Sequence, residues 1–531
     1  MSATPTDGTG KAIHQIARAA VIVIAAYLIT TPVRLLAHIL TANTFGTSPA
    51  SEAFFASNRF SEILFNLVAG GALGSAFIPT FTGLLTRKDH KSAWKLASAL
   101  ANLVLIILTI LSILTIVFAR EVVHYILAPG FSAIDPAKEA LAVELLRIQV
   151  PSAVIFGLSG LVMGILNANQ HFLLPALAPA MYNLGWIFGI VVLSPRTGVY
   201  GLAWGVLLGA GLHLLIQVPV LFRLPGRRYS PTLGLDFAPL REVARLMLPR
   251  LLGVAVVQLN FLLNTYLASL QPEGSVTAIS LAFPLMLMPQ AAIAQSIATA
   301  ALPTFSAQFA LGKIQEMRSS LTSTLRGVLL LAIPTSLGLI LLGEPLIALL
   351  YQRGEFTAQS TQLVAWALLW YSAGLVGHCI VEVISRAFYA LHDTKTPVLV
   401  GIGAMTLNLV FSLLFSALFR QIGWMPHGGL AFANSLATAL ESILLLILMR
   451  RRLNGLEGQR ILNLTLKTLL ASTLMSAAIW IWLSMASSML LWQVTLGGVI
   501  LGVAVFALTI ILLRVEEIGM AWSALRKTLH K

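Results

Sequence analysis

A cluster of charged and amide side chains occurs in the segment 45–81, which is otherwise mostly small or apolar. The cluster consists of Glu52, Arg59, Glu62 and Asn66. Spacings of seven, three and four residues would place these side chains on roughly one stripe of an α-helix. In lipid, such a stripe must face protein or a water-filled cavity. Two interpretations stay open: the stripe binds a charged head group, or it is an internal ion-pair network, with Glu62 neutralising Arg59, that fixes helix packing.

Two further apolar stretches carry polar side chains that need partners. Arg34 precedes the cluster, and a later stretch, LPRLLGVAVVQLNFLLNTYLASLQPEG, contains an arginine and several amides. Amides within a membrane span usually hydrogen-bond between helices, so helix packing and substrate contact are both open for them. The candidate substrate-binding residues are Arg34, Glu52, Arg59, Glu62, Asn66, Arg250, Gln258, Asn260 and Asn264.

A second possible ion pair lies further along the chain. Glu382 and Arg386 are four residues apart and can pair along one helix face. Because Arg386 lies near the end of its apolar stretch, its long side chain can also reach the membrane surface. We expect this pair to support folding rather than to bind substrate.

Motifs that would indicate an enzyme are missing from the sequence. It contains no P-loop, no GxSxG, no HExxH and no Cys/His metal spacing. Its one cysteine, Cys379, lies in an apolar stretch and excludes a disulfide framework. We expect no catalytic residues and no cofactor, and the sequence assigns no metal site. Any transport would then be driven by the membrane potential, by a monovalent ion gradient or by downhill flow.

The composition places these candidates in a membrane. Hydrophobic residues make up 57% of the 531 residues and charged residues 10%, with a mean hydropathy of +0.87. Ordinary soluble domains carry about 25% charged residues, and a span needs about 20 mostly apolar residues. The sequence therefore predicts an all-α integral membrane protein of about fourteen transmembrane helices. These lie near 15–44, 53–86, 92–119, 140–168, 173–193, 199–222, 240–270, 276–310, 319–349, 360–391, 396–419, 428–449, 462–486 and 491–514.

The positive charges predict an orientation. The net charge is +14, and most Lys and Arg fall at the termini and in alternate loops. The loops on the other side hold only Arg120, Lys138, Arg196, Arg353 and Arg420. Since cytoplasmic loops collect Lys and Arg, we expect both termini in the cytoplasm. The first apolar stretch is too long for a signal peptide and is expected to remain as helix 1, and an amphipathic tail at 516–531 is expected on the membrane surface.

The linker composition suggests a division into lobes. The segment 223–245 is rich in Pro, Gly and Arg and follows the sixth predicted helix. We predict an N-lobe of six helices at 1–222, a cytoplasmic linker at 223–245, a C-lobe of six helices at 246–452, and helices 13 and 14 with the tail at 453–531.

Several separated motifs resemble one family, the MurJ (MviN) lipid II flippases of the multidrug/oligosaccharidyl-lipid/polysaccharide exporter superfamily. The segment 45–79 resembles the family's helix 1–2 signature, and 248–306 resembles its helices 7 and 8. RGEFTAQSTQLVAWALLWYSAGL and SRAFYALHDTKTPVLV resemble its helix 9–11 region, and GGLAFANSLATALES its helix 12. The matches run in order along most of the chain.

The resemblance implies a flippase that moves a polyprenyl-diphosphate-linked peptidoglycan precursor, lipid II, across the cytoplasmic (inner) membrane by alternating access, for cell-wall synthesis and cell shape. It implies a cavity in which cationic side chains hold the diphosphate, and Glu52 and Arg59 match the family pattern. Phe65 and Pro284 stand where many members carry arginine. Expected partners are membrane lipids and either lipid II or a related lipid-linked glycan, and no nucleic acid is expected. The protein is expected to be a monomer that could work with cell-wall synthesis proteins. The alternatives are an exporter of another lipid-linked polysaccharide or of drugs, and a transport-inactive membrane scaffold.

Overall fold

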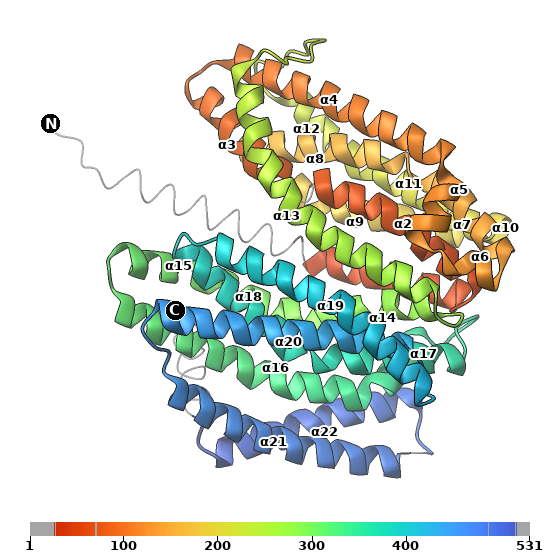
Figure 1. Cartoon of the computed structure of the whole chain (residues 1–531), viewed down its shortest axis with the longest axis vertical. Coiled ribbons are helices and arrows are strands. Elements are labelled where there is room, and N and C mark those ends of the chain that lie inside the picture. The colour runs from red at the N-terminus through yellow and green to blue at the C-terminus, as the bar shows by residue number, and fades with distance from the viewer. Residues whose placement is uncertain (1–25, 27, 69–71, 487, 516, 518–531) are drawn as a thin grey trace. The chain divides into compact units, whose positions relative to one another are not determined.

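The computed structural model describes residues 26, 28–68, 72–486, 488–515 and 517, and these form helices joined by short turns, with no strand in these ranges (Figure 1). Contacts divide the chain into two compact units, Met1–Leu270 and Gln271–Lys531. In the first unit, a helix over 28–45 is followed by α2 (Pro49–Val68), α3 (Ala72–Thr86), α4 (His90–Val117), α5 (Ala119–Glu121), α6 (Gly130–Ile134), α7 (Pro136–Gln149), α8 (Ser152–Ala168), α9 (Leu173–Phe188), α10 (Ser194–Thr197), α11 (Val199–Leu215), α12 (Val218–Arg223) and α13 (Ala238–Ser269).

The second unit contains the remaining helices. They are α14 (Ser275–Gln290), α15 (Ser296–Ala310), α16 (Ile314–Tyr351), α17 (Ala358–Ala373), α18 (Leu375–Ala390), α19 (Lys395–Gln421), α20 (His427–Arg452), α21 (Gly458–Met485) and α22 (Leu491–Leu512). Short π-helical segments at Val122–Leu127, Gly189–Leu193 and Ala291–Gln295 continue or join neighbouring helices. The sequence predicts a boundary at the linker 223–245, whereas the compact units divide after Leu270, because α13 packs on α2 and α3.

The described helices confirm the membrane class. Ten are long and apolar enough to span a membrane, and twelve spans result if two bent pairs each count as one. These twelve coincide with the predicted stretches from 92–119 onward. The other two predicted spans, 15–44 and 53–86, include residues outside the described ranges, so the count of fourteen is not confirmed. The predicted tail at 516–531 lies almost entirely outside those ranges as well.

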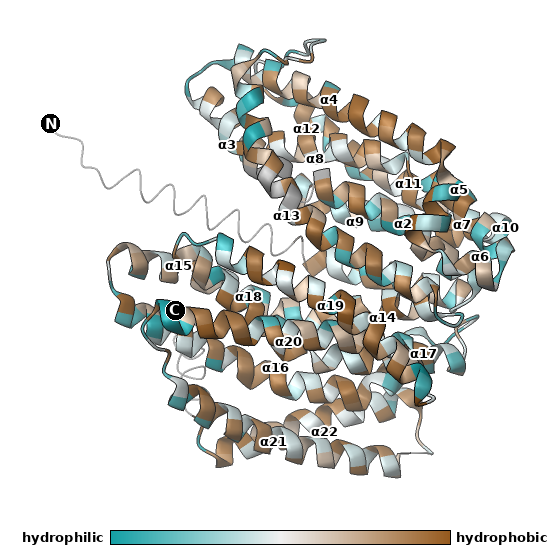
Figure 2. Ribbon diagram, in the orientation of Figure 1, coloured by the Kyte–Doolittle hydropathy of each residue, from teal (hydrophilic) through white to brown (hydrophobic). Residues whose placement is uncertain are grey.

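The outer surfaces of the spans are apolar. Figure 2 shows hydrophobic residues along much of α4 and α20. On α4, Ile107, Ile110 and Val117 are more than half exposed, at 59%, 53% and 62%. A soluble protein rarely exposes such a continuous apolar surface, so lipid is the solvent that these faces fit.

Close packing of α9 against α11 depends on glycine. A Cβ added at Gly205 of α11 would lie 2.7 Å from the Cα of Gly189, and one at Gly185 of α9 would lie 2.2 Å from the Cα of Gly209. Small residues let membrane helices approach until their backbones touch, which maximises van der Waals contact where no hydrophobic effect drives association. This contact holds α9 and α11 together behind the polar side chains of α2.

Candidate functional site

The predicted stripe on α2 begins with a buried ion pair. Glu52 accepts a hydrogen bond from Nζ of Lys138 in the first turn of α7, and both side chains are only 2% exposed. The ammonium group also lies 4.2 Å from the ring centroid of Phe131. A buried charge is stable only when it is paired, so the carboxylate of Glu52 is engaged within the protein. The sequence predicts Lys138 in an outer loop, and this prediction is wrong because the helix begins at Pro136 and turns Lys138 inward.

About two turns further along α2, Arg59 and Glu62 form a second ion pair. Nη1 of Arg59 lies 2.7 Å from Oε2 of Glu62, and Nδ2 of Asn58 donates to the other carboxylate oxygen at 2.9 Å. The side chains of Arg59 and Glu62 are 23% and 39% exposed, far more than those of the first pair. The ion pair of the packing interpretation is therefore present, and both of its side chains stay partly exposed.

Arg59 has partners within the protein, but not all of its N–H donors are hydrogen-bonded. Its guanidinium carbon lies 5.6 Å from the ring centroid of Phe261 on α13, a cation–π contact that orients the charged group. Its Nε is buried and has no hydrogen-bond partner within the described part of the chain. Arginine can bind phosphate oxygens through two parallel N–H groups. Arg59 is therefore the side chain of this site best suited to contact an anionic head group.

The last member of the stripe joins α2 to α13. Nδ2 of Asn66 lies 3.4 Å from Oε1 of Gln258, which is a long hydrogen bond. On the same helix, Nδ2 of Asn264 donates to the backbone oxygen of Asn260 at 3.1 Å, and both residues are half-buried. The structure therefore brings Glu52, Arg59, Glu62, Asn66 and Gln258 into one α2-centred cluster. Asn260 and Asn264 lie further along α13.

The two other candidate arginines are not part of this cluster as described. Arg34 is exposed on the helix over 28–45, and no ion pair to it is found among the described residues. The side chain of Arg250 lies outside the described part of the chain. In the second unit, Nη2 of Arg386 lies 2.7 Å from Oε1 of Glu382, which confirms the predicted pair.

A small cavity adjoins the stripe on its aromatic side. It has a volume of about 100 Å³, and its lining includes Glu62, Phe65, Phe156, Tyr182 and His213. The ring of Phe65 packs 4.6 Å from that of Phe156, centroid to centroid. The position at which the family resemblance implies an arginine is thus filled by aromatic packing, and Arg59 is the arginine of the α2 cluster.

Sequence reasoning missed three side chains that complete the cluster: Asn58, Lys138 and Phe261. For Lys138 a local signal exists, because Asp135 caps α7 by accepting from the backbone N–H of Ala137 at 2.9 Å, and proline follows it at the first helical position. An Asp-Pro pair is a common helix start. Asn58 and Phe261 carry no comparable signal, since their contacts depend on how α2 and α13 fold.

The fold defines the class of protein as a polytopic helical membrane protein. The structure matches a solved lipid II flippase MurJ in an inward closed conformation with a TM-score of 0.79, at 24% identity, over 93% of this chain and 99% of that one. It also matches an inward-facing multidrug resistance MATE family transporter of the MOP superfamily with a TM-score of 0.67, at 18% identity, over 81% of this chain and 98% of that one.

Within that class, the chain belongs to the lipid II flippase MurJ family, whose family model matches residues 41–501. It is 33% identical over 418 residues to the lipid II flippase MurJ of Burkholderia cenocepacia, and this alignment covers 78% of this chain and 80% of that protein. It is 29% identical over 519 residues to a probable lipid II flippase MurJ of Vibrio cholerae, which covers 94% and 96% of the two chains. The resemblance stated from the motifs is thereby confirmed.

Proposed function

We propose that this protein translocates lipid II, a polyprenyl-diphosphate-linked peptidoglycan precursor, across the inner membrane by alternating access. Family membership and the fold support this activity. The observation in the structure that carries it is Arg59, a partly exposed guanidinium within an apolar unit that has an unpartnered N–H donor in the described part of the chain. A cation inside a membrane protein is costly and is retained where it meets a charged ligand or pathway.

The proposed role of Arg59 is to bind the diphosphate. The pairing with Glu62 and the contact with Phe261 orient the guanidinium, and the exposed part of the side chain can meet a phosphate oxygen. Because Glu62 is itself 39% exposed, an incoming diphosphate can compete with it for Arg59. Exchange between an internal carboxylate and a ligand phosphate gives a binding step that is strong enough to select the head group and weak enough to release it.

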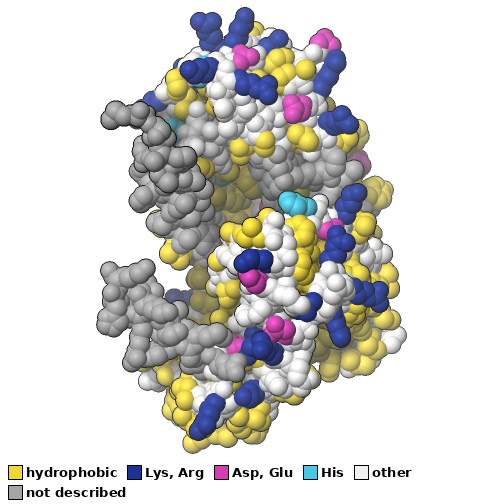
Figure 3. Space-filling model, turned by 90° about the vertical axis from the view of Figure 1, so that its left-hand side faces the viewer, with side chains coloured by type: hydrophobic (Ala, Val, Ile, Leu, Met, Phe, Trp, Pro, Cys, Tyr) yellow, Lys and Arg dark blue, Asp and Glu magenta, His cyan; other side chains and the backbone are white. Residues whose placement is uncertain are grey.

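The protein acts as a transporter and not as an enzyme in this proposal. It uses no cofactor, and its energy source is the membrane potential or a monovalent ion. It is a monomer that works beside cell-wall synthesis proteins, in contact with membrane lipids. Both termini lie in the cytoplasm. The distribution of Lys and Arg between alternate loops supports this orientation. The face drawn in Figure 3 carries many Lys and Arg side chains and fewer Asp and Glu side chains.

Two other functions can be compared with lipid II transport on the same observations. Transport of another lipid-linked polysaccharide or of drugs agrees with the fold shared with a MATE transporter. A transport-inactive scaffold agrees with the packing of Phe65 on Phe156, which occupies space beside Glu62. Lipid II transport is favoured over both because the family model covers most of the chain and Arg59 keeps a free donor.

Complementation tests the proposal. The gene is expressed in cells whose own lipid II flippase can be depleted, and the amount of protein in the membrane is measured in parallel. We expect growth and normal cell shape after depletion. Lysis despite normal membrane levels would contradict lipid II transport. Resistance to cationic drugs in the same cells would instead favour the drug-exporter alternative.

A further inference from the structure

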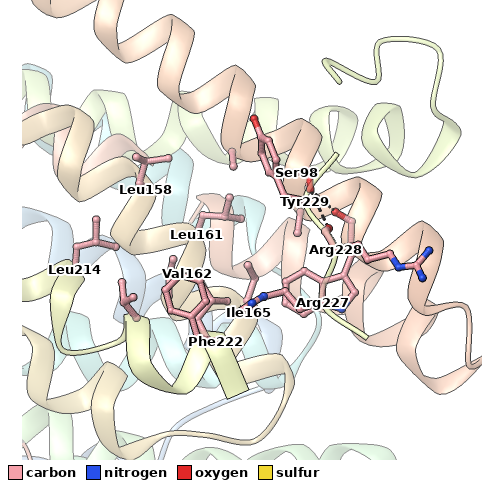
Figure 4. Close-up of a pocket in the computed structure, with 15 residues that line it drawn as sticks. Ser98, Leu158, Leu161, Val162, Ile165, Leu214, Phe222, Arg227, Arg228 and Tyr229 are labelled. Carbon is pink, nitrogen blue, oxygen red and sulfur yellow. Dashed lines mark hydrogen bonds between the residues drawn. The ribbon is translucent and has the colours of Figure 1, made fainter. Parts of the chain in front are cut away.

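A second cavity lies within the first unit, away from the α2 cluster. It has a volume of about 350 Å³ and lies between α4, α8, α11 and α12. Figure 4 shows its apolar wall, which includes Leu158, Leu161, Val162, Ile165 and Leu214. The volume falls within the range of sites that bind small molecules, about 300–1,000 Å³. In a membrane protein, walls of this kind fit a hydrocarbon chain.

Two arginines and a tyrosine line the cavity where the chain leaves α12. They are Arg227, Arg228 and Tyr229, and all three are exposed. The guanidinium carbon of Arg227 lies 4.3 Å from the ring centroid of Phe222, which also lines the cavity (Figure 4). No Asp or Glu is among the residues that line it. The cavity therefore combines an apolar interior with a purely cationic margin.

Hydrogen bonds hold this cationic segment against α4. Oγ of Ser98 accepts from the backbone N–H of Ser230 at 3.1 Å, and Nδ2 of Asn102 donates to the backbone oxygen of Thr232 at 2.9 Å. The hydroxyl of Tyr229 donates to Oδ1 of Asn102 at 2.8 Å. These bonds fix the backbone that carries the arginines. A site whose charged groups are already in place loses less entropy when a ligand binds.

A residue that lines the cavity has a buried donor without a partner. Trp94 of α4 lines the cavity and is 6% exposed, and its indole Nε1 has no hydrogen-bond acceptor within the described residues. A buried N–H without an acceptor costs about 1–3 kcal/mol. Because this Nε1 is itself buried, a ligand in the cavity would reach it only after the indole turns.

We propose that this cavity binds an anionic phospholipid, with one acyl chain against Leu161 and Val162 and the phosphate at Arg227. Basic pockets between membrane helices on the cytoplasmic side are suited to anionic head groups. The linker that forms the margin is one of the two proposed cytoplasmic loops with five Lys or Arg residues. Binding there joins α4, α8 and α12 to the linker and stabilises the first unit. The site is separate from Arg59 and does not depend on which substrate the protein transports.

Native mass spectrometry of the full-length protein in detergent tests the proposal, with thermal unfolding as a second readout. We expect phosphatidylglycerol to bind and to raise Tm more than phosphatidylcholine does. Arg227→Gln should weaken phosphatidylglycerol binding about fivefold, since a basic residue near an anionic lipid contributes about 1 kcal/mol. The matched control is Arg241→Gln, which removes one charge from the same linker at an exposed pair with Asp236, outside the cavity. It should bind like the wild type.

Two further arms separate the acyl chain from the head group. Ala101→Phe places a ring in the cavity and should weaken phosphatidylglycerol binding while the protein without lipid keeps its Tm. Glycerol phosphate, which has the head group and no chain, should neither bind nor raise Tm. The proposal would be overturned if both phospholipids bound equally or if Arg227→Gln and Arg241→Gln lost binding equally. It would also be overturned if glycerol phosphate had an effect as large as that of the lipid. Binding of undecaprenyl phosphate without binding of phosphatidylglycerol would overturn it as well.

Discussion

Arg59 and Glu52 illustrate how two charges on one helix can have different roles. Glu52 is fully buried against Lys138, whereas the side chain of Arg59 is partly exposed and its buried Nε has no hydrogen-bond partner in the described part of the chain. The spacing on α2 predicts that both charged side chains lie on the same stripe. It cannot tell which of the two charges is neutralised within the protein. In the proposed function, Arg59 takes the ligand-facing role and Glu52 a packing role.

Replacement of Arg59 tests the ligand-facing role. Arg59→Ala should abolish complementation at a normal membrane level, since a hydrogen bond to a charged group contributes about 1.5–3 kcal/mol. Arg59→Lys should retain partial activity, because lysine keeps the charge and loses the planar pair of donors. The measurement is growth after flippase depletion, normalised to the amount of protein in the membrane.

The matched control for this replacement is Arg386→Ala, which also removes a paired arginine from an apolar helix. Here we expect less protein in the membrane and normal transport per molecule. Wild-type growth with Arg59→Ala would contradict the binding role of Arg59.

A double-mutant cycle tests the packing role of Glu52. Lys138→Met alone removes the cation that neutralises a buried carboxylate and should destabilise the protein by about 3–5 kcal/mol. The double variant Glu52→Gln/Lys138→Met removes both charges and should recover most of the lost Tm and of the transport activity. If the double variant folds as well as the wild type and transports nothing, Glu52 contacts the substrate after all.

Helix packing was predictable from the sequence only in part. Apolar length predicts the twelve spans from 92–119 onward with ends close to those observed. It cannot show that α13 packs with the first unit. That packing depends on contacts of α13 with α2 and α3, two helices that lie far from α13 in the sequence. It also missed the start of α7, where only the Asp135 cap marks the helix and Lys138 is the residue that turns inward.

The contact of α9 with α11 gives a prediction about a single methyl group. Gly205→Ala would put a Cβ 2.7 Å from the backbone of Gly189, so the helices must move apart, at a cost of about 1–3 kcal/mol. Gly211 lies on the same helix with open space around its Cα. Gly211→Ala should therefore leave Tm unchanged or raise it slightly. Equal Tm values for the two variants in detergent would argue against the close contact.

At the scale of the whole molecule, the charge asymmetry makes a prediction about orientation. Both termini should lie in the cytoplasm, which requires an even number of spans. A C-terminal green fluorescent protein should therefore fluoresce and a C-terminal alkaline phosphatase should be inactive, since the first folds only in the cytoplasm and the second only outside it. The opposite pair of results would show that the span count or the orientation is wrong.

Substrate identity is the part of the account that the sequence and fold predict least directly. The chain belongs to the lipid II flippase MurJ family, yet aromatic packing of Phe65 replaces one expected cation, and Arg59 is the arginine through which the α2 cluster would bind the diphosphate. The central claim is therefore that lipid II itself crosses the membrane through this protein and depends on Arg59.

The most direct test measures the fraction of lipid II exposed on the outer face of the inner membrane in depleted cells that express each variant. Lipid II is cleaved from outside by an impermeant enzyme, and the cleaved fraction is quantified. We predict a wild-type cleaved fraction equal to that of undepleted cells and a background fraction for Arg59→Ala at the same protein level. A background fraction for the wild-type protein, inserted at a normal level, would contradict the account.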